Sequence, residues 1–124
     1  MAKLVLIVED NDTCAETLQI ALELIPGVES RVIGNPHAAL ATLNEHPGDV
    51  AAIVTDLHLH QSNGFDLIRR LRAEPKFARI PILLISGDSD PLLPQRALDL
   101  GADAFFAKPY SPSAVRRKLE QLLC

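Results

Sequence analysis

The sequence predicts an α/β fold, a doubly wound parallel sheet of five strands with helices on both faces. Short apolar runs alternate five times with segments whose apolar residues recur at helical spacing. Strands that alternate with helices in this way favour parallel pairing through right-handed crossovers. The length of 124 residues and the hydrophobic content of 48% fit one domain with a substantial core.

Each predicted strand is a short apolar run bounded by charged or turn-forming residues. The first, third and fourth runs are nearly continuous rather than alternating, which is typical of parallel strands covered on both faces. The predicted strands are residues 4–8, 30–33, 50–55, 81–85 and 104–107.

The first two helices follow from apolar spacing and from the residues that end them. Pro26-Gly27 stops the first helix, and Pro47-Gly48 lies where the second ends. The apolar positions are Cys14, Leu18, Ala21, Leu22 and Ile25 in the first helix, and Ala39, Leu40 and Leu43 in the second.

The remaining three helices carry clearer start and stop signals. The third starts near Asn63-Gly64, with Asn63 as its cap, and Gly101 ends the fourth. Ser111-Pro112 leads into the fifth. Pro91 and Pro94 confine regular structure in the fourth helix to residues after about Pro94. The apolar positions are Ile68 and Leu71, then Leu93, Ala97 and Leu100, then Val115, Leu119 and Leu122.

Composition and charge exclude several classes of protein. Twelve Lys and Arg against sixteen Asp and Glu leave a net charge of −4, which disfavours direct binding to nucleic acid. No apolar run approaches the ~20 residues of a membrane helix. The apolar run 4–8 is too short for a signal peptide, and Cys14 and Cys124 have no metal-type spacing. Two free thiols in the reducing cytoplasm are therefore expected.

Polar residues follow four of the predicted strands at the point where each strand ends. They are Glu9-Asp10, Asp56, Ser86-Gly87 and Lys108-Pro109. The carboxyl ends of parallel strands meet at one edge of a sheet, where ligands of this architecture bind. Three carboxylates there favour Mg²⁺, and a lysine and a hydroxyl beside them suit a phosphoryl group. The residues thus predict a magnesium-assisted phosphoryl site in which Asp56 is the nucleophile.

These pieces, taken in order, resemble the response-regulator receiver domain of two-component signalling, and the resemblance covers the whole chain. The matching segments are V-E-D-N around Glu9-Asp10, T-D-L-H-L around Asp56 with Gly64 eight positions on, and Ser86-Gly87 after the strand that Pro81 opens. G-A-D-A-F-F-A-K-P then spans residues 101–109. The resemblance implies that residues 1–124 form one receiver domain of flavodoxin-like fold, with strand order 2-1-3-4-5.

The resemblance also implies a role for each matching residue. Asp56 would accept the phosphoryl group from a histidine kinase or phosphotransfer protein. The metal ligands for Mg²⁺ would be Glu9, Asp10, Asp56 and the backbone carbonyl of His58. Lys108, Ser86 and the Gly87 N–H would bind phosphoryl oxygens, and Ser86 with Phe105 would form the switch. The downstream output protein or domain would bind the face formed by helix four, strand five and helix five. The resemblance thus implies a signalling switch rather than an enzyme.

The chain departs from the family's common pattern just after Asp56. Leu59 and His60 stand where methionine and proline are usual, and Asn63 replaces an aspartate that often precedes Gly64. Two other functions stay open. One is an interaction-only pseudo-receiver that is never phosphorylated. The other is a metal-dependent hydrolase in which Asp56, His58 and His60, alternating along an extended strand, bind Zn²⁺.

Overall fold

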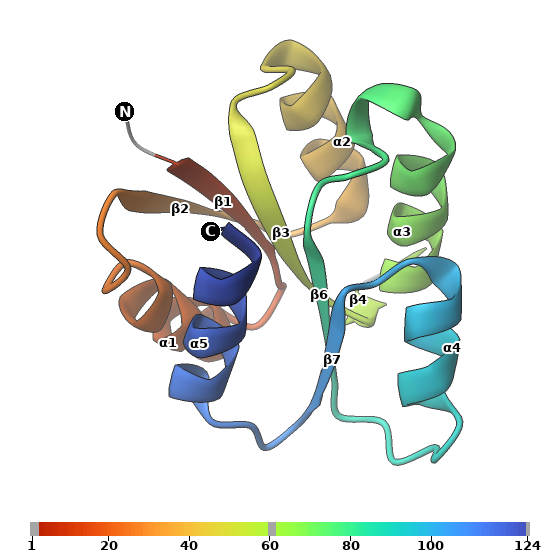
Figure 1. Cartoon of the computed structure of the whole chain (residues 1–124). Helices are drawn as coiled ribbons and strands as arrows, with labels where there is room; N and C mark the ends of the chain where they lie inside the picture. The colour runs from red at the N-terminus through yellow and green to blue at the C-terminus, as the bar shows by residue number, and fades with distance from the viewer. Residues whose placement is uncertain (1–2, 60–61, 124) are drawn as a thin grey trace.

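The computed structural model describes residues 3–59 and 62–123, and these form a three-layered α/β domain (Figure 1). Five parallel strands lie in the order β2-β1-β3-β6-β7, which is the predicted order 2-1-3-4-5. Helices α1 and α5 cover one face of the sheet, and α2, α3 and α4 cover the other. The doubly wound fold predicted from the alternation of strands and helices is confirmed.

The element bounds follow the predicted pattern closely. The sheet strands are β1 (Lys3–Val8), β2 (Val28–Ile33), β3 (Val50–Asp56), β6 (Ile82–Ser86) and β7 (Ala104–Ala107). The helices are α1 (Asp12–Leu22), α2 (Pro36–Glu45), α3 (Gly64–Ala73), α4 (Leu93–Leu100) and α5 (Pro112–Leu123), with a 3₁₀ turn at Pro75–Phe77.

Two apolar cores explain why the central strands are continuously hydrophobic. Leu6 and Ile53 face one core, with α2, α3 and α4, whereas Ile7 and Val54 face the other, with α1 and α5. Every residue of β6 is buried, because helices cover both sides of that strand. Because both faces of the central strands are buried, polar functional side chains can lie only at the ends of these strands.

The end of α1 and the position of Cys14 differ from the prediction. The helix stops at Leu22, and Ile25 reaches the core from the following turn, where its N–H donates to the Leu22 carbonyl at 3.1 Å. Apolar spacing alone does not separate a last helical turn from a tight turn that buries the same side chain. Cys14, expected to face the core, is only half-buried, and the neighbouring Ala15 is buried instead.

A short antiparallel hairpin was not predicted. β4 (His58–Leu59) pairs with β5 (Ser62–Asn63) directly after β3. The hairpin delivers the chain to α3, where the Asn63 Oδ1 accepts the Asp66 N–H at 3.0 Å, so the predicted cap is confirmed. His60 lies outside the described residues. Among the described helices, none is long and apolar enough to cross a membrane.

Candidate functional site

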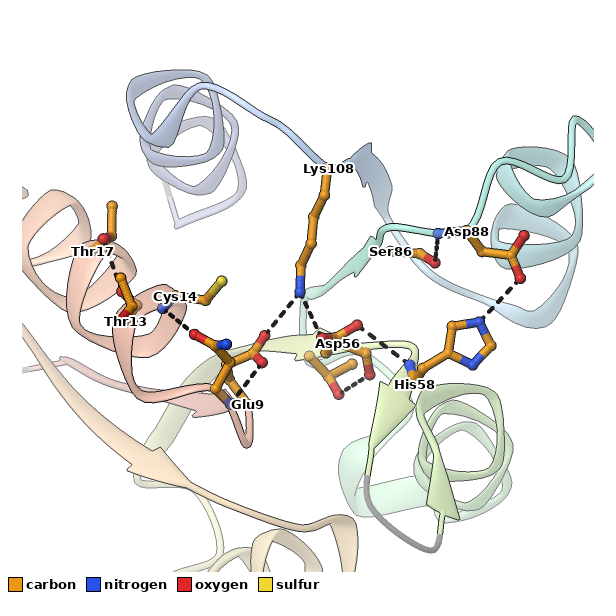
Figure 2. A network of polar contacts seen from close by, with 11 residues as sticks. Glu9, Thr13, Cys14, Thr17, Asp56, His58, Ser86, Asp88 and Lys108 are labelled. Atoms are coloured by element: carbon orange, nitrogen blue, oxygen red, sulfur yellow. Dashed lines mark hydrogen bonds and ion pairs between the residues drawn. The ribbon is translucent and has the colours of Figure 1, made fainter.

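The carboxyl edge of the sheet brings the polar strand-end residues together (Figure 2). Glu9 follows β1, Asp56 ends β3, Ser86 ends β6 and Lys108 follows β7. β1, β3 and β6 are adjacent in the sheet, and β7 brings Lys108 in from the edge beside β6. The prediction that these residues share one edge of the sheet is therefore confirmed by the strand order.

Lys108 bridges two carboxylates across this edge. Its Nζ lies 2.8 Å from the Asp56 Oδ2 and 3.6 Å from the Glu9 Oε2. Figure 2 shows the ammonium between the Glu9 side chain, which follows β1, and the Asp56 side chain at the end of β3. A single cation between two acids partly neutralises them and leaves a compact anionic centre.

Burial makes this centre electrostatically costly. Glu9 is 3% exposed and Asp56 is 6% exposed. Burial raises the pKa of Glu9 to about 7; the Asn11 N–H on its carboxylate opposes this rise, and the charge of Asp56 adds to it. Burial alone would lower the pKa of Lys108, but the hydrogen bond and charge of Asp56 outweigh it and the pKa is raised. The fold therefore favours a charged lysine between acids that repel each other.

The donor set fits a hard divalent cation. Glu9, Asp10 and Asp56 each offer a carboxylate oxygen, and these oxygens lie within 4.8 Å of one another. Oxygen-only ligands in small number, with Asp10 at the exposed rim, suit Mg²⁺, which retains several waters. A bound cation would also relieve the repulsion among the three acids.

The backbone around Asp56 is held from several sides. Its Oδ1 accepts the His58 N–H at 3.3 Å, and its carbonyl accepts the Thr55 hydroxyl at 2.9 Å. Gly64 passes close beneath, where an added Cβ would lie 2.6 Å from the Asp56 carbonyl oxygen. Only glycine allows the start of α3 to approach the nucleophile candidate this closely.

Ser86 and Gly87 border the site beside Lys108. The Ser86 side chain is fully buried, and its Oγ accepts the Asp88 N–H at 3.0 Å. The Lys108 N–H donates to the Ser86 carbonyl at 2.8 Å, which ties the ends of β6 and β7 together. A Cβ on Gly87 would meet the Lys108 side chain at 3.8 Å, so Gly87 and Lys108 are neighbours.

The His58 imidazole points away from the carboxylates of Glu9 and Asp56. Its Nε2 lies 3.1 Å from the Asp88 Oδ2, and Figure 2 shows the ring directed toward the loop after β6. Within the described part of the chain, the residues grouped as possible metal ligands at this edge are all carboxylates. This direction of the His58 side chain gives the zinc hypothesis no support.

Phe105 lies in β7 opposite Leu84 of β6 and is half-buried. Its side chain packs against the core that α2, α3 and α4 share. The aromatic side chain is therefore partly exposed to solvent, and it faces α4 rather than α5.

Three features of the site were not anticipated from the sequence. Asn11 donates its N–H to the Glu9 Oε1 at 3.0 Å and caps α1 through its side chain. Asp88 contacts both His58 and Ser86. A cavity of about 470 Å³ adjoins Lys108, lined also by Thr13, Cys14, Thr17, Gly87, Pro109, Tyr110 and Pro112. The N-cap signal could have found Asn11, but nothing local predicts the other two.

Comparison with known proteins agrees with this geometry. A family model described as the response regulator receiver domain matches residues 5–120. The chemotaxis protein CheY1 of Helicobacter pylori strain J99 is 29% identical over 119 residues, covering 95% of this chain and 94% of that protein. The chemotaxis protein CheY homolog of Campylobacter jejuni is 32% identical over 84 residues, 68% of this chain and 62% of the relative's length.

Solved structures show the same fold. A putative response regulator from Chloroflexus aurantiacus superposes with a TM-score of 0.89 at 28% identity, covering 99% of this chain and 98% of that one. The signal receiver domain of a histidine kinase from Syntrophus aciditrophicus has a TM-score of 0.85 at 32% identity, with 98% and 90% covered.

Proposed function

The chain belongs to the family of response regulator receiver domains, and from that premise we propose that it is a phosphoacceptor whose acceptor is Asp56. Receiver domains are signalling switches that bind Mg²⁺ at an acidic pocket, and response regulators interact with histidine kinases and downstream effectors. In this proposal, residues 1–124 form one receiver domain that takes its phosphoryl group from a histidine kinase or phosphotransfer protein.

The observation that carries this proposal is the arrangement around Lys108. Its ammonium lies 2.8 Å from Asp56, within a group of three carboxylates that could hold a metal, and its backbone N–H donates to the carbonyl of the buried Ser86 at 2.8 Å. A metal site alone needs no lysine, and a structural salt bridge needs no third carboxylate. The combination suits a site that binds a cation and an anionic group together.

The proposed reaction moves one phosphoryl group. The bond between phosphorus and a ring nitrogen of the donor histidine breaks, and a bond between phosphorus and an Asp56 carboxylate oxygen forms. Lys108, the Ser86 hydroxyl and the Gly87 N–H bind the phosphoryl oxygens. Glu9, Asp10, Asp56 and the His58 carbonyl would hold Mg²⁺, which would neutralise the charge that develops during transfer. Catalysis of this kind depends on positioning and charge, not on a proton donor.

The proposed switch links this site to the outer face of α4, β7 and α5. Ser86, on engaging the phosphoryl group, leaves space that Phe105 fills. Phe105 already contacts the core beneath α4, and Leu92 and Leu98 expose 65% and 47% of their surface on that side of the molecule. A downstream output protein or domain would bind there. The protein would act in the cytoplasm, without direct contact to nucleic acid or membrane.

The test is intact-mass analysis after incubation with a small acyl phosphate and Mg²⁺. Wild type is expected to gain one phosphoryl mass, and Asp56→Asn none. Lys108→Ala should retain Mg²⁺ binding. It should lose either most of the phosphoryl uptake or most of the conformational change that follows phosphorylation. Equal labelling of Asp56→Asn would contradict the assignment of the acceptor.

Phosphoryl uptake in this assay, together with titrations with Mg²⁺ and Zn²⁺, separates the two alternatives. A pseudo-receiver would bind Mg²⁺ without phosphoryl uptake. A hydrolase would show tight Zn²⁺ binding that His58→Ala with His60→Ala abolishes. We expect the double variant to keep both Mg²⁺ binding and phosphoryl uptake.

A further inference from the structure

Arg72, near the end of α3, binds five acceptors from segments far apart in the chain. Its Nε donates to the Gly101 carbonyl at 2.9 Å, and one terminal nitrogen donates to the carbonyls of Phe77, Ala78 and Ile80 at 2.8–3.3 Å. The other terminal nitrogen lies 3.2 Å from the Asp103 Oδ2. The side chain is only 19% exposed. Such a half-buried, multidentate guanidinium holds its partners in one geometry.

The turn between α4 and β7 is shaped around this side chain. Gly101 has φ +113°, and an added Cβ would lie 2.8 Å from the Arg72 Cγ and 3.0 Å from its Nε. Asp103 accepts the Ile82 N–H at 2.8 Å through the same oxygen that contacts Arg72. The carboxyl end of α4 is therefore joined to α3 and to the start of β6 by directional bonds.

The amino end of α4 is held differently. Leu92 precedes the helix without a side-chain cap, and its N–H donates to the Asp90 Oδ1 in the same loop at 2.9 Å. Leu93 is buried, but apolar contact is not directional. Among the residues that the structure describes, one hydrogen bond from this loop to another segment joins Asp88 to His58, and both side chains are exposed. An exposed pair of this kind contributes little.

The same loop begins at the phosphoryl site. Ser86 ends β6, and its Oγ accepts the Asp88 N–H, four residues before Leu92. A movement of the Ser86 hydroxyl therefore reaches α4 at its weakly held end first.

We propose that Arg72 anchors the carboxyl end of α4, so that displacement starting at Ser86 swings the amino end and stops at Gly101. Arg72 is a positioning residue in this device, which rests on the proposed function. Leu92 at the mobile end would move more than Leu98 near the anchor. Figure 1 shows α4 on the same face of the sheet as α3, the helix that carries Arg72.

Hydrogen exchange without any ligand tests the anchor by itself. The amides of Ala102 and Asp103, which donate to Ala97 and Ile82 at 3.0 and 2.8 Å, are expected to exchange at least about tenfold more slowly than those of Leu93 and Arg96. Arg72→Lys should remove that difference, because an ammonium cannot bind five acceptors. Equal exchange at both ends in wild type would overturn the proposal.

Beryllium fluoride with Mg²⁺, as a phosphoryl mimic, tests the pivot. Exchange at residues 88–96 should change, and exchange at 101–103 should stay within about twofold. In Arg72→Lys the change should extend to 101–103, and in Arg69→Lys, a control on the exposed side of α3, it should not. A wild-type change at 101–103 as large as at 88–96 would refute the pivot. Absence of any response near Asp56 would instead refute the proposed function, while the ligand-free measurement still tests the anchor.

Discussion

Two half-buried cations at opposite edges of one sheet are used in opposite ways. Lys108, at the carboxyl edge, is 26% exposed and faces Glu9 and Asp56 in a group of three carboxylates. Arg72, at the amino edge, is 19% exposed and faces one carboxylate and four backbone carbonyls.

The difference lies in charge balance. Three ionised carboxylates against one ammonium would leave an excess of two negative charges around Lys108. Arg72 and Asp103 balance each other, and neutral carbonyls accept the remaining guanidinium hydrogens. A site that is to bind a cation and an anion cannot have its charges balanced before they bind, whereas a structural clamp can. The two regions therefore predict opposite changes in stability when a carboxylate is neutralised: Asp103→Asn should destabilise the protein and Asp56→Asn should stabilise it.

The largest effect is expected at the clamp. Arg72→Ala leaves the Asp103 carboxylate and several carbonyls without their donor, and should lower the free energy of unfolding by about 3 kcal/mol. Asp103→Asn should also destabilise, by less. Urea unfolding of the two variants measures this. A stabilised variant at either position would contradict the description of a balanced clamp.

The pH dependence of the metal-free protein should expose the imbalance at the carboxyl edge. The pKa of Glu9 is raised from 4.5 to about 7, so between these values the folded state binds more protons than the unfolded state. Stability from this group is complete below pH 4.5 and is lost as the pH rises toward 7, by roughly 2 to 3 kcal/mol, since one pKa unit is worth about 1.4 kcal/mol.

Unfolding in a chelator from pH 4.5 to 8 measures this loss, and Glu9→Gln is the matched control. The variant should lose less stability than wild type across the same range. Parallel curves for the two proteins would contradict the role given to Glu9.

Asp56→Asn should stabilise the metal-free protein by about 1 kcal/mol, because it removes one of the repelling charges. Lys108→Ala should do the reverse. The stabilisation that Mg²⁺ gives wild type should shrink in Asp56→Asn, since one ligand is lost. Thermal unfolding with and without Mg²⁺ shows both effects. A Mg²⁺ response that is unchanged in Asp56→Asn would mean that the metal binds elsewhere.

The smallest effect is expected on the surface of α3. Arg69 contacts Asp66 at 3.0 Å, three positions earlier, with both side chains more than half exposed. Arg69→Ala should change stability by less than about 0.5 kcal/mol. Compared with Arg72→Ala on the same helix, this variant shows how far burial and acceptor number, not charge, determine the effect. A loss as large as that of Arg72→Ala would remove the distinction.

The sequence by itself determined the layers of this protein and the composition of its polar edge. Continuous apolar runs produce buried parallel strands wherever they occur, and Gly101 and Asn63 act on the residues next to them. Glu9, Asp56, Ser86 and Lys108 could be grouped because the ends of parallel strands must meet at one edge. These are local patterns combined with a single rule of topology.

Only the tertiary structure decided the contacts that depend on partners without a sequence pattern. The acceptors of Arg72 are mostly backbone carbonyls, which every residue carries, and the acceptors lie 5 to 31 positions away. His58 meets Asp88 across 30 positions because the β4–β5 hairpin and the loop after β6 converge. The end of α1 was misplaced because Ile25 is buried whether or not the helix continues. Apolar periodicity records which side chains are buried, whereas the direction of a hydrogen bond exists only once the chain has folded.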